Sequence, residues 1–480
     1  MPLEFPRPHV SNRPLGRRTR RGPIRYLAVI DGEHYPPVVE SALEGVEKRG
    51  HEVAAAVLVG GQEKLPGSGR PVYGPFRVIS APDPRAGLDD AIRELRPDAI
   101  LDLSDEPVLD YRRRFDLVAV ALFRGVRYEG ADFRLDPPPL PRLCAAPSIA
   151  IVGTGKRTGK TAVSAFAART LAARGDRPVV VAMGRGGPEE PEVLRGDEIT
   201  LRPADLLALA DAGKHAASDY IEDALLARVR TVGCRRCGGG LAGAVGVSNV
   251  ARGVEVANRL AAGILLLEGS GSALPPVAAD VTGLVVPASI PSEYLDGYLG
   301  PYRLLLADFV VITMAEEPFA SPSQVSSITA RVRTAWRPAG AEDDGGRRVI
   351  RTVFRPSPTR PIEGAAVFVA TTASEAAGDA IREHLERVHG CRVVGISHSL
   401  SDRTRLEGDL SGVESSRANV LLCEIKAAGI DTATRYALER GLEVVYMDNV
   451  PHGIDGDDVT AIVEWAAGEA ARRYQLESRD

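Results

Sequence analysis

The sequence predicts an α/β protein in which a central domain built on a parallel sheet is flanked by two smaller α/β domains. Short apolar runs alternate with longer amphipathic runs along the whole chain, which is typical of parallel strands joined by helices. A chain of 480 residues is too long for one hydrophobic core and suits about three domains. Two stretches rich in proline, glycine or charge interrupt the alternation and mark the expected boundaries.

These boundaries divide the chain into residues 1–22, 23–143, 144–345 and 346–480. The first segment is rich in Pro and Arg and lacks the apolar core of a secretory signal, so it predicts a flexible basic tail. The stretch "YEGADFRLDPPPLPRL" is interpreted as a linker, because its prolines cannot enter a sheet or a helix interior. The stretch "RPAGAEDDGGRR" closes the central domain.

The composition excludes several classes of protein. A net charge of −5 gives no overall basic footprint for nucleic acid. No apolar run reaches about 18 residues, so no membrane span is expected. Five cysteines are too few for a disulfide scaffold and indicate a cytoplasmic protein. Cys234 and Cys237 in "CRRC" are interpreted as ordinary thiols, with a shared metal or a disulfide across a dimer axis as the alternative.

The N-terminal domain opens with "IRYLAVIDGEHY", which predicts a strand over residues 24–30. A helix over residues 36–50 and a strand over residues 51–59 follow. The stretch "PDAILDLSD" repeats the pattern, with Asp102 and Asp105 where its strand ends. We therefore expect a small α/β layer in this region.

The central domain contains "AIVGTGKRTGKTAVS", a glycine loop between a predicted strand and a predicted helix. Glycines let backbone N–H groups surround phosphate oxygens, and the following helix N-terminus favours an anion. Lys160 suits the β- and γ-phosphates, and the Thr161 hydroxyl suits Mg²⁺. Thr154 stands where the common P-loop spacing has its first glycine, between Gly153 and Gly155. The strand–loop–helix context nevertheless predicts binding of a nucleoside triphosphate.

Two further cations, Lys156 and Arg157, lie inside this loop. They would either neutralise additional anionic charge or point to solvent. The residues assigned to nucleotide binding are Gly153, Thr154, Gly155, Thr158, Gly159, Lys160, Thr161, Ala162 and, from a later strand end, Glu316.

The stretch "AAGILLLEGSGSALPPV" predicts a buried strand that ends in Glu268. A carboxylate at the end of a strand beside a phosphate-binding loop is suited to hold Mg²⁺, directly or through water. Thr161 and Glu268 are therefore the expected metal residues, with a structural turn carboxylate as the alternative for Glu268.

Other strand ends supply charged groups. "VVVAMGRGGPEEPEV" places Arg185 where it could grip a phosphate, followed by acidic residues that would orient a metal or be exposed. "TVGCRRCGGGLAGAVGVSN", with Arg235 and Arg236, is too glycine-rich for a helix or strand and is interpreted as a loop that closes on a ligand. "DFVVITMAEEPFASPSQV" predicts a strand ending at Glu316, where the base of a nucleotide would be contacted, and then a helix.

The C-terminal domain shows four apolar runs, "AAVFVAT", "CRVVGIS", "ANVLLCEI" and "LEVVYMD", with helical stretches between them. Lys426 lies just after the third of these runs. "VTAIVEWAAGEAARRYQ" predicts a last amphipathic helix.

Taken in order, these segments resemble the cyclic 2,3-diphosphoglycerate synthetase family. The resemblance is carried by "IDGEHYPPVV", "GTGKRTGKT", "MGRGGPEEPE", "LLLEGSGSALPPV", "VVITMAEEPFASPSQV" and "LLCEIKAAGIDTATRYALERGLEVVYMDN", which span most of the chain. The central domain alone is similar to dethiobiotin synthetases, although those carry acidic loop residues where this chain has Gly155 and Arg157.

The resemblance implies an ATP- and Mg²⁺-dependent ligase that closes 2,3-diphosphoglycerate into a ring through an intramolecular phosphoanhydride. It implies catalytic roles for Lys160, Lys156, Arg157 and Arg185, and substrate binding by Arg185, Arg235 and Arg236, with His34 and Lys426 as remoter candidates. A homodimer is expected for a metabolic enzyme of this size. The alternatives are a P-loop kinase or ligase acting on another phosphorylated or carboxylated metabolite, and an ATP-driven switch that binds a partner protein.

Overall fold

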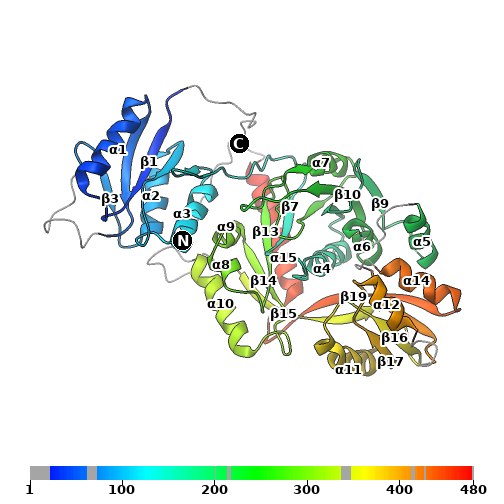
Figure 1. The fold of residues 1–480 in the computed structure, drawn as a ribbon. Coiled ribbons are helices and arrows are strands. Elements are labelled where there is room, and N and C mark those ends of the chain that lie inside the picture. The colour runs from blue at the N-terminus through cyan, green and yellow to red at the C-terminus, as the bar shows by residue number, and fades with distance from the viewer. Residues whose placement is uncertain are drawn as a thin grey trace.

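The computed structural model of this chain describes residues 22–61, 73–200, 202–212, 218–336, 348–411, 417–425 and 429–477. They form two sheets covered by helices, so the predicted α/β class is confirmed (Figure 1). The basic tail expected over residues 1–22 lies outside the described residues except for Gly22, and so does Lys426. None of the helices in the described ranges is both long and apolar enough to cross a membrane.

The N-terminal domain contains a six-stranded sheet in the order β3-β2-β1-β4-β5-β6. Its elements are β1 (Arg25–Ile30), α1 (Pro36–Lys48), β2 (Glu52–Leu58), β3 (Val78–Ser80), α2 (Pro84–Leu95), β4 (Ala99–Asp102), α3 (Tyr111–Phe123), β5 (Arg127–Glu129) and β6 (Arg134–Leu135). The strands are parallel except for the β5–β6 pair. The direction of strand order reverses between β1 and β4, where parallel sheets of this kind open a crevice.

One part of the predicted linker is wrong. Its first residues form β5 and β6, because Tyr128 fills the core and its hydroxyl donates to Asp102 at 2.9 Å. The proline-rich remainder after Leu135 contains no strand up to β7, as expected from residues that lack a backbone N–H.

The second sheet runs through the rest of the molecule in the order β11-β10-β8-β12-β7-β13-β14-β15-β19-β18-β16-β17, with β9 paired to β10. Its central strands are β7 (Ser148–Gly153), β8 (Pro178–Gly184), β9 (Glu192–Arg195), β10 (Arg230–Cys237), β11 (Val247–Ser248), β12 (Ile264–Glu268), β13 (Val281–Pro287) and β14 (Phe309–Thr313). The others are β15 (Arg348–Pro358), β16 (Ala366–Ala370), β17 (Arg392–Ser397), β18 (Val420–Glu424) and β19 (Glu443–Gly453).

The helices and one 3₁₀ turn of this part are α4 (Lys160–Ala173), α5 (Pro203–Asp211), α6 (Asp219–Leu226), α7 (Val250–Asn258), α8 (Glu293–Asp296), α9 (Gly300–Leu306), α10 (Pro322–Trp336), η2 (Glu375–Ala377), α11 (Gly378–His389), α12 (Arg403–Leu410), α14 (Ile430–Glu439) and α15 (Val459–Glu477). They cover both faces of the sheet, so a central strand is buried on both sides. In β12, Leu265 and Leu267 belong to one core and Leu266 to the other.

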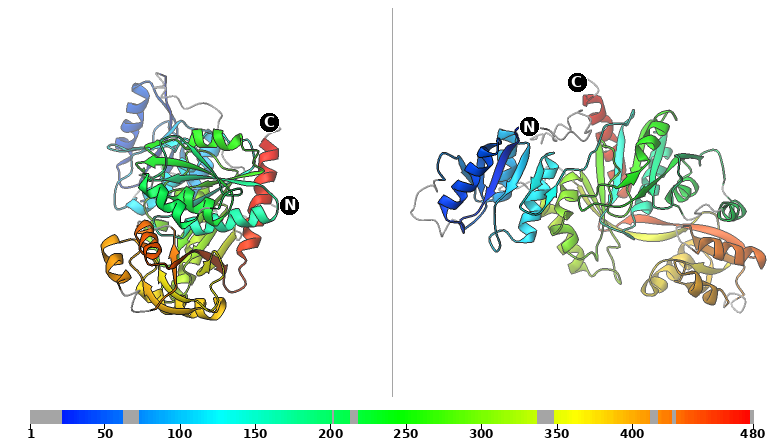
Figure 2. Two further views of the ribbon diagram at one scale, coloured as in Figure 1. Left: turned by 90° about the vertical axis from the view of Figure 1, so that its right-hand side faces the viewer. Right: turned by 45° about the horizontal axis from the view of Figure 1, so that its top comes forward.

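Two long strands join the central layer to a C-terminal lobe, which we define as the described residues between Thr352 and Gly453. The first part of β15 pairs in parallel with β14, and its second part pairs antiparallel with β19. The first part of β19 pairs in parallel with β18 inside the lobe. The N-terminal domain and this lobe lie at opposite ends of the molecule (Figure 2).

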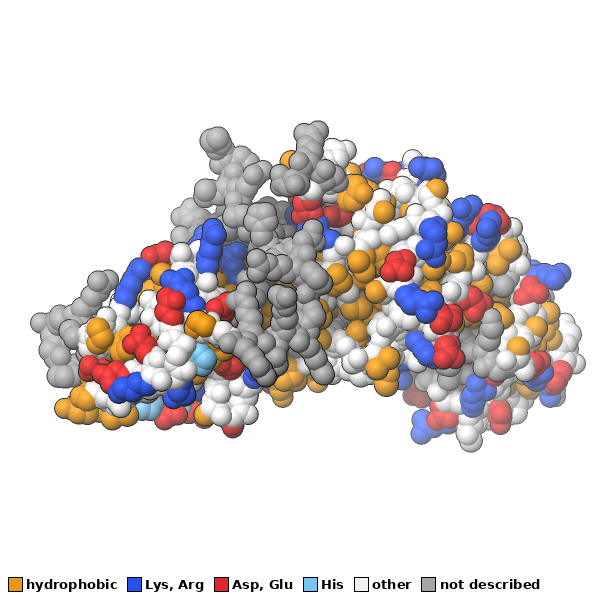
Figure 3. All heavy atoms as spheres, turned by 90° about the horizontal axis from the view of Figure 1, so that it is seen from above, with side chains coloured by type: hydrophobic (Ala, Val, Ile, Leu, Met, Phe, Trp, Pro, Cys, Tyr) orange, Lys and Arg blue, Asp and Glu red, His pale blue; other side chains and the backbone are white. Residues whose placement is uncertain are grey.

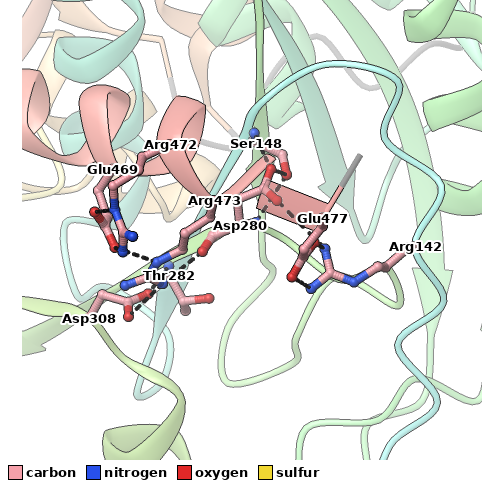
Figure 4. Close-up of polar contacts among 9 residues, drawn as sticks. All are labelled: Arg142, Ser148, Asp280, Thr282, Asp308, Glu469, Arg472, Arg473 and Glu477. Atoms are coloured by element: carbon pink, nitrogen blue, oxygen red, sulfur yellow. Dashed lines mark hydrogen bonds and ion pairs between the residues drawn. The ribbon is translucent and has the colours of Figure 1, made fainter. Parts of the chain in front are cut away.

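After the lobe, the chain returns to the central layer as α15, which packs against α4 and β7. Charged side chains near the C-terminal end of α15 hold it against the central layer (Figure 4). Arg473 Nη1 donates to the Asp280 carbonyl oxygen at 2.8 Å and forms an ion pair with Asp308 Oδ1 at 3.0 Å. Glu477 forms an ion pair with Arg142, which precedes β7. The last helix therefore completes the central layer.

The glycine-rich stretch with Arg235 and Arg236 is predicted to be a loop throughout, and this prediction is wrong at both of its ends, where β10 and β11 pair with each other. Residues up to Cys237 form β10, which pairs in parallel with β8. Gly233 is accommodated because its missing side chain leaves room for the Tyr220 ring, which would lie 2.6 Å from a Cβ atom there.

The two cysteines of "CRRC" point to opposite faces of this strand, because side chains three residues apart alternate in a strand. Cys234 is buried and Cys237 is exposed, and burial raises the pKa of Cys234 to about 12. One such pair cannot chelate a single metal ion or close a disulfide within the chain.

Candidate active site

A cleft of about 740 Å³ lies between the carboxyl-terminal edge of the central sheet and the C-terminal lobe. The glycine loop forms its floor, and the ends of β8, β12 and β14 form its central-sheet side. The opposite side consists of β15, β19 and the loops that follow β16 and β18. The cleft therefore lies where the carboxyl ends of parallel strands bind ligands.

The glycine loop connects β7 to α4 as predicted. Helix α4 begins after Gly159, whose φ of 82° is a left-handed value that favours glycine. The first turn of α4 contains no acidic residue, so the positive end of the helix dipole faces the cleft uncompensated. The hydroxyl oxygens of Thr154 and Thr158 are buried and have no hydrogen-bond partner within the described part of the protein. The loop is thus arranged to receive a polar, anionic ligand.

Lys160 lies at the start of α4 and is 7% exposed. Its Nζ atom forms an ion pair and hydrogen bond with Glu268 Oε1 at the end of β12. Asp223 of α6 is completely buried beside Glu268. Burial, together with the negative charge of Glu268, raises the pKa of Asp223 well above its ordinary value. One lysine therefore lies beside two buried carboxyl groups, an arrangement suited to a divalent cation or a proton.

Arg185 and Arg236 lie together beside Gly271, in the loop that follows Glu268. A Cβ atom at Gly271 would lie 2.6 Å from Arg185 Nη2 and 3.5 Å from Arg236 Nη2. Arg236 donates to the Ser270 carbonyl oxygen at 2.7 Å. Burial lowers the pKa of Arg236, and the charge of Arg185 lowers it further. Neither guanidinium forms an ion pair with a carboxylate of the described residues, so their charge is available to an anionic ligand.

Arg235 is turned away from this pair, since neighbouring residues of a strand point to opposite faces. Its guanidinium lies 3.4 Å from Glu189, and Glu190 pairs with Arg252 at 2.7 Å. The structure thus separates Arg235 from Arg236, and it places Glu189 and Glu190 in surface ion pairs.

At the other end of the cleft, Glu316 follows β14 and forms a bidentate ion pair with Arg355 of β15, with Nη2 to Oε2 at 2.7 Å. This hydrogen bond raises the pKa of Arg355. The neighbouring Phe354 lies directly over Gly159, where a Cβ atom would come within 2.3 Å of its ring. These contacts hold the C-terminal lobe against the glycine loop.

The side of the cleft formed by the lobe is organised by Glu424, the last residue of β18. Its carboxylate is 6% exposed and accepts hydrogen bonds from the Thr371 hydroxyl at 2.7 Å and the Asn449 amide at 2.9 Å. Thr372 donates to it from both its backbone N–H and its hydroxyl. Next to it, Asp448 forms an ion pair with Arg169 of α4 at 2.7 Å. Glu424 therefore connects the end of β18 to the residues that follow β16 and to the middle of β19.

The structure brings together most of the predicted site. The residues from Gly155 to Ala162, with Arg185 and Glu316, line the cleft, and the side chains of Lys156 and Arg157 are exposed in it. Gly153 is the last residue of β7, and Thr154 is the first residue of the loop that follows it. His34 lies in the N-terminal domain and not in the cleft, with Nδ1 2.9 Å from the buried Asp31 and Nε2 3.3 Å from Asp105.

Sequence reasoning missed the cleft residues Phe354, Arg355, Glu424 and Asp448, and also Asp223. Two of these carried a usable signal, because Glu424 and Asp448 stand at the ends of apolar runs in the same way as Glu268. Asp223 lies in an amphipathic helix, where a carboxylate is ordinarily solvated, so its pattern gave no such signal.

The surface carries no continuous field of one charge on the face drawn in Figure 3, where basic and acidic side chains are interspersed. This agrees with the net charge of −5.

Three family models match successive parts of the chain. Residues 25–136 match the N-terminal domain of cyclic 2,3-diphosphoglycerate synthetase, residues 148–339 its P-loop domain, and residues 358–450 its C-terminal domain.

The cyclic 2,3-diphosphoglycerate synthetase of Rubrobacter xylanophilus is 47% identical over 436 residues, which cover 90% of this chain and 96% of that protein. The synthetase of Methanothermobacter thermautotrophicus is 44% identical over 462 residues, covering 92% and 97%. Among solved structures, LpxK from Aquifex aeolicus in complex with ATP is 14% identical and covers 74% of this chain and 96% of its own, with a TM-score of 0.39, too distant to inform the site.

Proposed function

Since this chain belongs to the cyclic 2,3-diphosphoglycerate synthetase family, we propose that its cleft closes 2,3-diphosphoglycerate into the cyclic phosphoanhydride with the energy of ATP. The products are ADP and inorganic phosphate. The observation that carries this proposal is that the glycine loop and Arg185 line a single cleft, with Arg236 next to Arg185 beside Gly271.

ATP would bind with its phosphates on the backbone amides of the glycine loop, at the uncompensated N-terminus of α4. Lys160 would exchange its ion pair with Glu268 for the terminal phosphate and follow that phosphate to the transition state. A preorganised charge of this kind stabilises developing negative charge most strongly where water is excluded.

Mg²⁺ fits the residues beside Lys160. The Thr161 hydroxyl and the carboxyl groups of Glu268 and Asp223 offer hard oxygen ligands of the kind that Mg²⁺ prefers. No cluster of three or more His, Cys, Asp or Glu groups arranged for a metal occurs in the described ranges, so phosphate oxygens and water would complete the ligand set. When bound, Mg²⁺ neutralises part of the phosphate charge.

The substrate, with one carboxylate and two phosphates, would bind beyond the terminal phosphate of ATP. Arg185 and Arg236 would bind its anionic groups, and the exposed Lys156 and Arg157 would add positive charge. Arg235 is not part of this set because it pairs with Glu189. Guanidinium groups bind phosphate with two parallel hydrogen bonds, which fixes both position and direction.

The chemistry then needs positioning more than a protein nucleophile. An oxygen of one substrate phosphate attacks the γ-phosphorus, a P–O bond forms, and the bond to ADP breaks. An oxygen of the neighbouring substrate phosphate next attacks the inner phosphorus, which closes the ring and expels inorganic phosphate. Arg185 and Arg236 would hold the two substrate phosphates together against their mutual repulsion.

We also propose a homodimer that acts in the cytoplasm, from the size of the chain and its five free thiols. Light scattering on the purified protein tests the first point.

The reaction is tested by incubating the protein with ATP, MgCl₂ and 2,3-diphosphoglycerate and recording phosphorus NMR spectra. The expected result is a new phosphoanhydride resonance, together with equal amounts of ADP and phosphate. Release of ADP and phosphate with no new anhydride resonance would contradict the proposal. The Lys160→Ala variant is the control for contaminating activity.

A further inference from the structure

Arg303 of α9 is a buried cation that forms no ion pair with a carboxylate of the described residues. Its side chain is 7% exposed, and burial lowers the pKa of Arg303 to about 10. Its hydrogen bonds go to backbone carbonyl oxygens instead. A buried charge is costly unless hydrogen bonds satisfy it, so the segments that carry these carbonyls are held close to the guanidinium.

Arg303 connects two loops of the central layer. The first is the turn over residues 269–274, where Nε and Nη2 both donate to the Ser272 carbonyl oxygen, at 3.0 and 2.9 Å. The second is the loop over residues 238–246, where Nη2 donates to the Leu241 carbonyl oxygen at 3.1 Å. Nη1 donates to the Leu299 carbonyl oxygen at the start of its own helix. One planar guanidinium thus attaches both loops to α9.

Arg236 connects the same two loops. Its Nη2 atom donates to the Ser270 carbonyl oxygen at 2.7 Å, and its Nη1 atom donates to the Gly238 carbonyl oxygen at 3.1 Å. Arg303 holds carbonyls that lie two and three residues further along these loops. The position of the groups that orient Arg236 therefore depends on Arg303.

The turn is attached to the strand before the glycine loop independently of Arg303. The Gly269 N–H donates to the Ile151 carbonyl oxygen of β7 at 2.9 Å. This backbone hydrogen bond would remain if the contacts of Arg303 were lost. Their loss would therefore disturb Arg236 more than the glycine loop.

We propose that Arg303 is a positioning residue for the substrate, because it holds these two loops together so that Arg236 lies beside Arg185. This proposal rests on the proposed function for the identity of the substrate. Arg303 does not line the cleft, so it acts through the two loops. Helix α9 also packs against α3, so Arg303 connects the N-terminal domain to the loops that hold the substrate arginines.

The test compares the KM for 2,3-diphosphoglycerate with the KM for ATP in Arg303→Met, which keeps an unbranched side chain but removes its donors. The KM for 2,3-diphosphoglycerate is expected to rise by about tenfold, since a displaced guanidinium loses part of a charge-assisted hydrogen bond, and the KM for ATP by less than about twofold. Arg303→Lys keeps one donor nitrogen and should give a smaller rise of about threefold. It replaces Arg303→Met if that variant does not fold.

The control is Trp336→Phe, which removes a hydrogen bond of 2.6 Å from the indole N–H to the Leu304 carbonyl oxygen of the same helix. It should change neither KM, because it leaves the two loops attached to Arg303.

A double-mutant cycle separates positioning from general support of the fold. In the Arg236→Ala background, Arg303→Met should change the KM for 2,3-diphosphoglycerate by less than about twofold, because the group that it positions is gone. A further tenfold rise in that background would overturn the proposal. Equal rises in both KM values, or no rise in the single variant, would also overturn it.

Hydrogen exchange in the free protein keeps this inference separate from the proposed function. Arg303→Met should speed exchange in residues 238–246 and 269–274, and Trp336→Phe should not. If the wild-type protein forms no phosphoanhydride, the proposed function fails, and faster exchange in these two loops would still support their attachment by Arg303. Unchanged exchange in both loops would overturn the inference whatever the reaction.

Discussion

The N-terminal domain and the central layer both place a buried carboxylate at the end of a parallel strand, with different results. Asp31, after β1, accepts hydrogen bonds from the backbone of Glu33, His34 and Asp105 and from the His34 ring. Glu268, at the end of β12, instead faces Lys160 and the buried Asp223. The Asp31 carboxylate thus holds the loops around it in place. The Glu268 carboxylate lies instead beside a lysine and a second buried carboxyl group, a cluster of charges suited to bind a ligand. Position in the fold is thus insufficient to identify a catalytic carboxylate.

The largest effect that the comparison predicts belongs to Lys160. We expect Lys160→Ala to lower turnover by at least about 100-fold, because one preorganised charge on a transferred phosphoryl group contributes about 3 kcal/mol or more. Release of ADP in the presence of 2,3-diphosphoglycerate measures it. Lys48→Ala, at a lysine whose side chain is 73% exposed, is the control. Wild-type turnover in Lys160→Ala would remove the glycine loop from the mechanism.

The next largest effect is expected for substitutions of Arg185 and Arg236. Arg185→Ala and Arg236→Ala should each raise the KM for 2,3-diphosphoglycerate by about 10- to 100-fold and change the KM for ATP much less, since a hydrogen bond to a charged group is lost on the substrate only. Initial rates with each substrate varied in turn separate the two constants. Arg235→Ala is the matched control from the same strand. Equal increases in both KM values would refute the assignment to substrate.

A smaller effect is expected at Asp223. Asp223→Asn should stabilise the free protein by on the order of 1 kcal/mol, because it removes a carboxyl group that burial and Glu268 make costly to ionise. The same variant should weaken Mg²⁺-dependent ADP binding. Thermal unfolding and calorimetry with and without Mg²⁺ measure the two effects. A variant that is less stable yet binds Mg²⁺ and ADP normally would make Asp223 a structural residue like Asp31.

The smallest effect should be at His34. Its hydrogen bond to Asp31 raises the pKa of His34, so the stability that the pair contributes is fully present below about pH 6.5 and is lost as the pH rises through the raised pKa. We expect His34→Ala to cost less than about 1 kcal/mol at pH 6 and less still at pH 9, with turnover unchanged. Urea unfolding at both pH values checks this. A large loss of turnover would place the N-terminal domain in the active site.

Much of the site could be predicted from sequence because its signals are local. The glycine loop, Lys160, Thr161 and Glu268 each stand within a few residues of a strand end, and a strand followed by glycine and charge is readable in a single stretch. The contact between Phe354 and Gly159 joins positions far apart in the chain, so no local pattern records it.

The fold also has features that no local sequence pattern could predict. The alternation of elements predicted the α/β class. Gly233 and the glycines that follow Cys237 gave no indication of β10, a strand that is stabilised by its pairing with β8 and by the Tyr220 ring. Likewise, nothing in the apolar runs of β15 and β19 indicated that each would pair in parallel at one end and antiparallel at the other. Pairing partners are a property of the assembled sheet.

The return of α15 to the central layer has a consequence for how the protein is made. The helix that completes the layer around β7 and α4 is synthesised only after every strand of that layer and after the C-terminal lobe. Domains generally fold in turn from the N-terminus during synthesis, yet here the central layer stays unfinished until residues 459–477 have been added. A nascent chain truncated before residue 459 would therefore present an uncovered apolar face to the chaperones that meet it.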